Sequence, residues 1–105
     1  MTFETFERDD RLVLQIEGEL DAVTRLELRS EIERIVHARR HLDIDLSQVN
    51  TIDSSGVGVV VALWRRIRAS GFQARIVGLR DDPLAIFRIL NLERVMSTPA
   101  PLPKT

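Results

Sequence analysis

The sequence predicts a small α/β domain in which helices cover one face of a sheet. Apolar residues alternate with other residues near the N-terminus and again at residues 42–46, whereas elsewhere they recur with the helical period. The resulting order is strand, strand, helix, strand, helix, strand, helix, which is typical of parallel strands joined by helical crossovers. In "LDIDL", helices on both faces would bury two aspartates without partners, so we expect helices on one face only.

The first twenty residues predict a hairpin of two strands. The runs "TFETFER" and "RLVLQIEGEL" are joined at Asp9-Asp10. In the second run Leu12, Leu14 and Ile16 occupy every second position, which is the period of a strand with one buried face.

A helix and a third strand follow the hairpin. The helix spans residues 23–38 and has one buried stripe, formed by Leu28, Ile32, Ile35 and Val36. The strand "LDIDL" then places its three apolar residues on one face and Asp43 and Asp45 on the other. Carboxylates two residues apart on an exposed strand face are most simply solvated, so we expect both to face water.

A second helix begins after "TIDSSG" and ends near Gly71. The residues expected to hold it to the sheet are Val57, Val60, Val61, Trp64 and Ile67. The segment "FQARIVGL" then reads as a fourth strand.

The C-terminal part predicts a short third helix in "DDPLAIFRILN". Asp82 is the expected N-cap, Pro83 the first helical residue, and Asn91 lies just past the end. Three of the four prolines follow, without periodicity. We therefore assign residues 1–96 to one domain and residues 97–105 to a disordered Pro-rich tail.

Composition excludes several classes of function. A net charge of -1 gives no bulk attraction to nucleic acid or to an anionic membrane, and no apolar run approaches the length of a membrane span. The absence of cysteine removes disulfides and thiolate chemistry and favours the cytoplasm. His37 and His41 lack a third metal ligand, and neither serine of "DSSG" lies in a hydrolase elbow. We expect neither a metal nor a cofactor, and no enzymatic activity.

The stretch "TIDSSGVGVVVALW" is the strongest candidate for a functional site. Asp53, Ser54 and Ser55 are all good helix caps, but a cap requires only one such residue, so a further role for a hydroxyl stays open. Gly56 and Gly58 in the first helical turn weaken the helix by about 1 kcal/mol each relative to alanine. They indicate either close contact between helix and sheet or room for another molecule.

The outer side of the same helix suggests a partner surface. On a helical wheel Val59 and Ala62 fall opposite the apolar stripe and share that side with Gly58, Arg65 and Arg66. Small apolar groups beside arginines suit a protein interface. Scattered exposed apolar residues are also ordinary, so the pattern leaves both interpretations open.

Two separated segments together carry a family resemblance. "GELDAVTRLEL" (18–28) and "DLSQVNTIDSSGVGVV" (45–60) resemble the anti-sigma-factor antagonists, bacterial single-domain members of the STAS family. The resemblance extends in element order over residues 2–96. It implies the STAS fold, a small mixed sheet of four to five strands with helices mainly on one face.

The resemblance also implies a partner switch. The unphosphorylated antagonist binds a serine-kinase anti-sigma factor with a histidine-kinase-like ATPase fold and so releases the kinase's client. The kinase then phosphorylates the first hydroxyl after the aspartate, here Ser54, and a PP2C-type phosphatase restores it. Asp21 corresponds to the family's acidic residue beside the site, and Ser55, Gly56 and Gly58 to the helix start that the kinase covers.

A second class of STAS protein gives the rival hypothesis. In a transporter subunit or a scaffold of a stress-sensing complex, the same surface binds a partner without a phosphorylation cycle. An enzyme is the third and most distant alternative.

Overall fold

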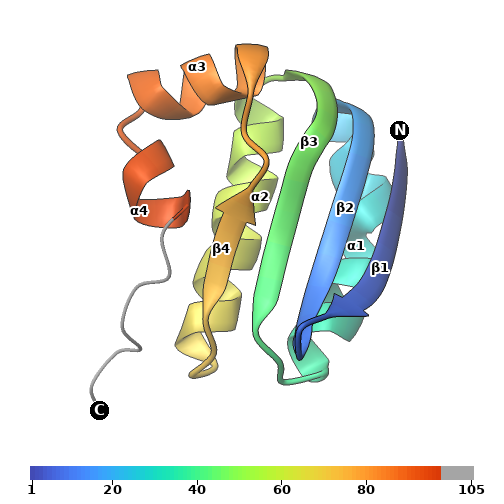
Figure 1. Ribbon diagram of the computed structural model, residues 1–105. Coiled ribbons are helices and arrows are strands. Elements are labelled where there is room, and N and C mark those ends of the chain that lie inside the picture. The colour runs from blue at the N-terminus through green and yellow to red at the C-terminus, as the bar shows by residue number, and fades with distance from the viewer. Residues whose placement is uncertain (98–105) are drawn as a thin grey trace.

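The computed structural model describes residues 1–97. Their four strands form one mixed sheet in the order β1-β2-β3-β4. Strands β1 (Thr2–Arg8) and β2 (Arg11–Leu20) pair antiparallel, and β3 (Leu42–Ile52) and β4 (Ala74–Val77) continue the sheet in parallel (Figure 1). The predicted hairpin and the predicted mixed sheet are confirmed.

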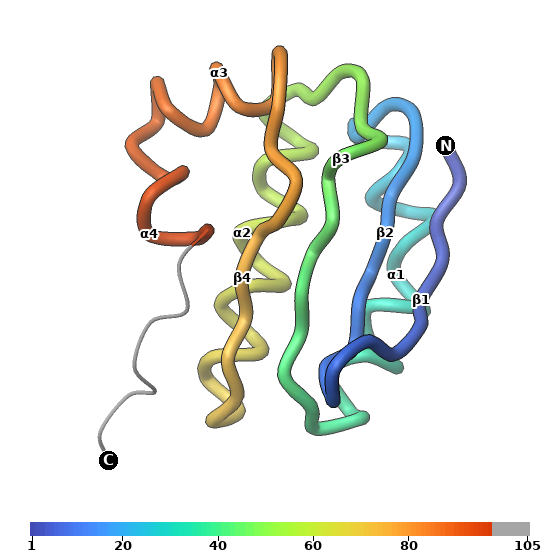
Figure 2. Tube along the Cα trace, in the orientation of Figure 1, coloured from blue at the N-terminus to red at the C-terminus, as the bar shows by residue number. Residues whose placement is uncertain are grey.

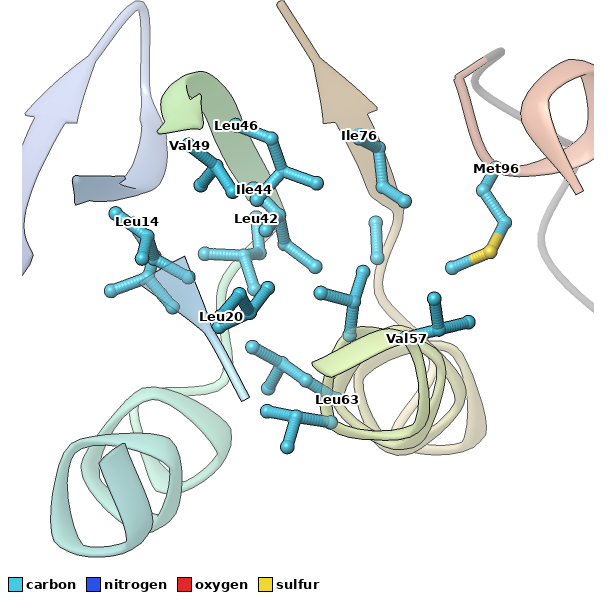
Figure 3. Close-up of a cluster of buried hydrophobic side chains, with 14 of the residues drawn as sticks. Leu14, Leu20, Leu42, Ile44, Leu46, Val49, Val57, Leu63, Ile76 and Met96 are labelled. Carbon is cyan, nitrogen blue, oxygen red and sulfur yellow. The ribbon is translucent and has the colours of Figure 1, made fainter. Parts of the chain in front are cut away.

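Two long helices cover one face of this sheet. Helices α1 (Ala22–His37) and α2 (Ser54–Ala69) lie side by side behind the strands in Figure 1, and Figure 3 shows them on the same side of the sheet. The shorter α3 (Asp81–Ile89) and α4 (Glu93–Ser97) lie beside β4, as the chain trace in Figure 2 shows. No helix within residues 1–97 is long and apolar enough to cross a membrane.

The β1–β2 turn explains why the chain reverses at Asp9-Asp10. Both residues have positive φ, 53° and 63°, which matches the twist of a two-residue hairpin. Aspartate tolerates this left-handed conformation better than most residues do. The flanking Arg8 and Arg11 are paired across the turn, so the register is set directly at the reversal.

The apolar core fills the space between the sheet and the two long helices (Figure 3). Leu28 of α1 and Val60 of α2 are almost fully buried, as predicted. The stripe on α2 is nevertheless rotated, because Leu63 and Val59 are buried whereas Val61 and Trp64 are only half-buried. Helix α2 contacts α1 as well as the sheet, so its buried surface is wider than a single stripe facing the strands.

The expectation that Asp43 and Asp45 face water is wrong. Their exposed fractions are only 7% and 8%. Arg11 Nε and Arg75 Nε each donate to Asp43 Oδ1 at 2.7 Å, and the backbone N–H of Ser47 donates to Asp45 Oδ1 at 2.8 Å. Long side chains of the strands themselves cover this face. The helices do lie mainly on one face as predicted, but the aspartates are buried with partners.

The ionisation of Asp43 reflects two opposing effects. Burial raises its pKa, but hydrogen bonds from Arg75 and Arg11 outweigh burial, so the pKa of Asp43 lies below its ordinary value. Arg75 shows the reciprocal change, because the hydrogen bond to Asp43 raises the pKa of its guanidinium. Asp43 is therefore a charged, paired group that links β2, β3 and β4.

The C-terminal elements differ in detail from the prediction. Helix α3 begins before the expected cap at Asp82; Arg80 occupies the N-cap position and makes no side-chain capping bond. Asn91 lies just past the helix with a φ of 57°, as expected for a helix end. Ser97, where the predicted tail begins, is the last residue of α4, and residues 98–105 lie outside the described part of the chain.

Candidate functional site

Two helix starts meet at one end of the sheet. Leu20 at the end of β2 pairs with Ile52 at the end of β3, and each is followed by an aspartate that leads into a helix. The backbone N–H of Asp53 donates to the carbonyl of Leu20 at 3.3 Å. The parallel pairing therefore brings the "GELD" and "DSSG" segments together, and Asp21 lies beside the start of α2.

Each aspartate caps its own helix. Asp21 Oδ1 accepts from the backbone N–H groups of Val23 and Thr24 at 3.0 and 3.1 Å. Asp53 Oδ1 accepts from the N–H of Gly56 at 2.9 Å. The backbone hydrogen bond from Thr24 is the largest cause that lowers the pKa of Asp21 below its ordinary value. Both helix starts thus carry a carboxylate that is already engaged with the backbone.

The two serines are not needed for capping. Within residues 1–97 neither the Ser54 nor the Ser55 hydroxyl has a hydrogen-bond partner, because Asp53 alone supplies the side-chain cap of α2. Ser54 is exposed and Ser55 is half-buried. Ser54 is also the first residue of α2, where free N–H groups and the helix dipole favour an anion. Asp53 therefore supplies the cap, and both serine hydroxyls are left without a part in capping.

The two glycines serve different purposes. Gly56 is buried, and a Cβ atom there would lie 2.0 Å from the carbonyl oxygen of Leu20. The prediction that Gly56 contacts a partner is therefore wrong, because this glycine lets α2 lie directly against the end of β2. Gly58 is exposed, and a Cβ there would meet nothing within 4 Å. Gly58 leaves open surface beside the serines.

A groove of about 760 Å³ runs between α1 and α2 and reaches both serines. Its wall and floor include Arg25, Leu26 and Arg29 of α1 and Gly58, Val59 and Ala62 of α2. Ala62 is exposed, as the sequence predicts, but Val59 is only 7% exposed and belongs to the core. The expected exposed position of Val59 is thus corrected: its side chain lies at the groove floor because α1 flanks α2 on that side.

The part that α1 plays in the groove was not predicted from the sequence. Leu26 is 71% exposed and Val23 is 63% exposed, although both are apolar. Ala22, Arg25, Leu26 and Arg29 fall at i, i+3, i+4 and i+7, which is the signal of a second helical face beside the core stripe. That spacing alone could not identify the face as one side of a groove, because the partner wall belongs to another helix.

An ion pair joins the two helices at the far end of the groove. Arg66 of α2 donates to both carboxylate oxygens of Glu33 of α1, at 2.6 and 3.1 Å. The hydrogen bond lowers the pKa of Glu33 and raises the pKa of Arg66. The positive charge of Arg66 is therefore balanced by the carboxylate of Glu33.

Comparison with known proteins agrees with this architecture. The family profile described as STAS domain matches residues 2–104. The chain is 31% identical over 98 residues to the anti-sigma-B factor antagonist of Listeria monocytogenes, which covers 91% of this chain and 86% of the relative.

Solved structures share the fold. An anti-sigma factor antagonist from Mycobacterium paratuberculosis superposes with a TM-score of 0.76 at 24% identity, covering 90% of this chain and 81% of that one. The Bacillus cell fate determinant SpoIIAA in its phosphorylated form gives a TM-score of 0.72 at 19% identity, covering 95% of this chain and 92% of that one. The fold implied by the "GELD" and "DSSG" segments is confirmed.

Proposed function

Because the chain belongs to the STAS-domain family, we propose that it is an anti-sigma-factor antagonist whose partner binding is switched by phosphorylation of Ser54. In this cycle the unphosphorylated form binds a serine-kinase anti-sigma factor of the histidine-kinase-like ATPase fold and releases its client. A PP2C-type phosphatase removes the phosphate and so restores the unphosphorylated, binding form. The cycle operates in the cytoplasm.

One observation carries this proposal. Ser54 is exposed at the N-terminus of a helix that Asp53 already caps, and its hydroxyl has no hydrogen-bond partner within residues 1–97. A kinase can reach this hydroxyl without opening the helix. The names of relatives support the general role, and the phosphorylated form of SpoIIAA indicates that a protein of this fold accepts such a group.

The contact surface of the proposed switch surrounds Ser54. Its accessible part is supplied by Asp21, Asp53, Ser55, Gly58 and Ala62. Gly56 and Val59 are buried and shape this surface from beneath. A phosphate would add about -1.5 to -2 charges beside Asp21 and Asp53. The helix dipole offsets only about 0.3 to 1 kcal/mol of the resulting repulsion. Binding is lost because the added charge would be desolvated in a protein interface.

Substitution of Ser54 tests the proposal. We expect Ser54→Ala to bind the kinase constitutively and to take up no phosphate from ATP, and Ser54→Asp to bind at least about tenfold more weakly. Ser55→Ala is the matched control, because it removes the neighbouring hydroxyl and should leave phosphorylation intact. Mass spectrometry and titration calorimetry with the purified kinase measure both properties.

Two results would contradict the proposal. Phosphate on the Ser54→Ala protein would move the site to another residue. Binding of the kinase without any phosphorylation would instead favour the rival STAS scaffold or transporter subunit.

A further inference from the structure

The groove between α1 and α2 extends from Ser54 to Arg66, and part of its lining is apolar. Leu26 on one wall is 71% exposed, Ala62 on the other is exposed, and Val59 lies between them at the floor. Gly58 leaves open space in the same groove. An exposed leucine beside an open concave surface favours contact with another apolar side chain.

The ion pair between Glu33 and Arg66 shows which residues of α1 lie at the same level as which residues of α2. Both helices follow parallel strands and lie side by side, so residues separated by the same sequence offset face one another (Figure 1). Arg29 is therefore near the level of Ala62, and Arg25 is near the level of Gly58, about one helical turn from Ser54.

The charge of the groove is uneven. Arg25 and Arg29 are exposed, line the groove and form no ion pair within residues 1–97. Arg66 is paired with Glu33, whose charge also acts on Arg29 at longer range, so three arginines and one glutamate leave the groove with a net positive charge. This local excess stands out in a chain whose net charge is -1.

We propose that this groove binds a protein segment whose apolar side chains are flanked by carboxylates, with Arg25 and Arg29 as the residues that select it. The inference rests on the proposed function and names the chemistry of the partner at that site. Leu26 and Ala62 contact the apolar side chains, and the two guanidinium groups pair with the carboxylates. The slight negative charge of the whole chain disfavours a polyanion such as nucleic acid or a lipid surface.

The groove also gives the switch a second physical basis. Ser54 lies at the same end of the groove as Arg25. A phosphate on Ser54 would place negative charge where a carboxylate of the partner otherwise approaches Arg25. It would therefore repel the partner and also neutralise the group that selects it.

Charge reversal tests the inference. We expect Arg25→Glu/Arg29→Glu to bind the purified kinase at least about tenfold more weakly than wild type at low salt. The difference should shrink as the salt concentration rises, because the charges on the exposed wall are screened. Arg94→Glu is the matched control: Arg94 is an exposed arginine of α4 that does not line the groove, so its reversal should leave affinity near that of wild type.

The outcomes separate this inference from the proposed function. If wild type binds the kinase and is phosphorylated at Ser54 but the double variant binds equally well, the groove inference is overturned and the switch is kept. An equal loss in Arg94→Glu, or arginine-dependent binding to DNA or to anionic lipid vesicles, would also overturn it. If wild type neither binds nor is phosphorylated, both fail. Circular dichroism of each variant establishes that it is folded.

Discussion

At the scale of single residues, Gly56 and Gly58 are two positions apart yet differ in what surrounds them. Gly56 lies against the backbone of Leu20, whereas Gly58 faces open space. Both lie in the first turns of α2 and neither requires a left-handed backbone. Gly56 is therefore required for packing against β2, whereas Gly58 is under no such constraint because it lies on the surface.

Alanine at each glycine should move stability in opposite directions. Gly56→Ala inserts a methyl group where only 2.0 Å is available, so we expect a loss of unfolding free energy of about 1 to 3 kcal/mol or more. Gly58→Ala should gain up to about 1 kcal/mol from helix propensity. Urea unfolding measures both changes. A stable Gly56→Ala protein would show that α2 can move away from β2.

The stabilising contribution of Asp43 is expected to depend on pH. Its pKa is lowered in the folded state, so its stabilising contribution is present above its ordinary pKa of 3.8 and is lost as pH falls through the lower folded value. Asp43→Asn should be less stable than wild type at neutral pH, because Arg11 and Arg75 lose their partner. The deficit should shrink below about pH 4.

Chemical denaturation at pH 7 and pH 3 measures the Asp43 deficit. Glu33→Gln is the control, because the Glu33 pair is exposed and screened by solvent and should contribute little at either pH. The same deficit for Asp43→Asn at both pH values would mean that the Asp43 charge does not stabilise the fold.

At the scale of secondary structure elements, the starts of α1 and α2 each depend on one aspartate. Asp21 both caps α1 and adds charge beside Ser54, and these two effects can be separated. Asparagine caps helices about as well as aspartate does but carries no charge.

Substitution of Asp21 should therefore distinguish capping from charge. Asp21→Ala should lose about 0.5 to 2 kcal/mol of unfolding free energy, whereas Asp21→Asn should stay close to wild type. In the Ser54→Asp background, Asp21→Asn should recover part of the lost affinity for the kinase, because one like charge is removed. Equal affinities with and without Asp21→Asn would show that repulsion by Asp21 has no part in the switch.

Much of the element order could be predicted from the sequence, because each long element has a clear period. Each prediction that the structure corrects has an identifiable physical cause. The buried face of α2 is wider than predicted, because α1 buries Val59 and Leu63 from a second side, which one periodic stripe cannot indicate. Helix α4 is only five residues long, too short to show a period, although Met96 in it is buried.

The candidate site could be predicted in part. The spacing of "DSSG" after a strand identified the start of α2, but burial of Gly56 depends on the carbonyl of Leu20 on another strand. The arginine partners of Asp43 likewise lie on β2 and β4, so its burial was not visible in "LDIDL". Contacts between residues far apart in sequence account for these differences.

At the scale of the whole molecule, the proposed switch changes the surface and leaves the fold intact. The Ser54 hydroxyl has no hydrogen bond within the described residues, so a phosphate on it breaks no side-chain hydrogen bond. We expect the phosphorylated and unphosphorylated forms to have melting temperatures within a few degrees of each other. Calorimetry on the two forms tests this, and a drop of about 10 °C or more would mean that phosphorylation acts by unfolding.

The hydrogen bond from Asp53 to the Leu20 carbonyl has a kinetic consequence. Together with the contact of Gly56 on the same carbonyl, it holds the backbone around Ser54 in place before any partner arrives. Such a preorganised surface needs no slow rearrangement during encounter. The observed rate constant of association should therefore rise linearly with kinase concentration, without the plateau that a conformational step would impose. The residence time of the antagonist on the kinase should then govern how long the client remains free.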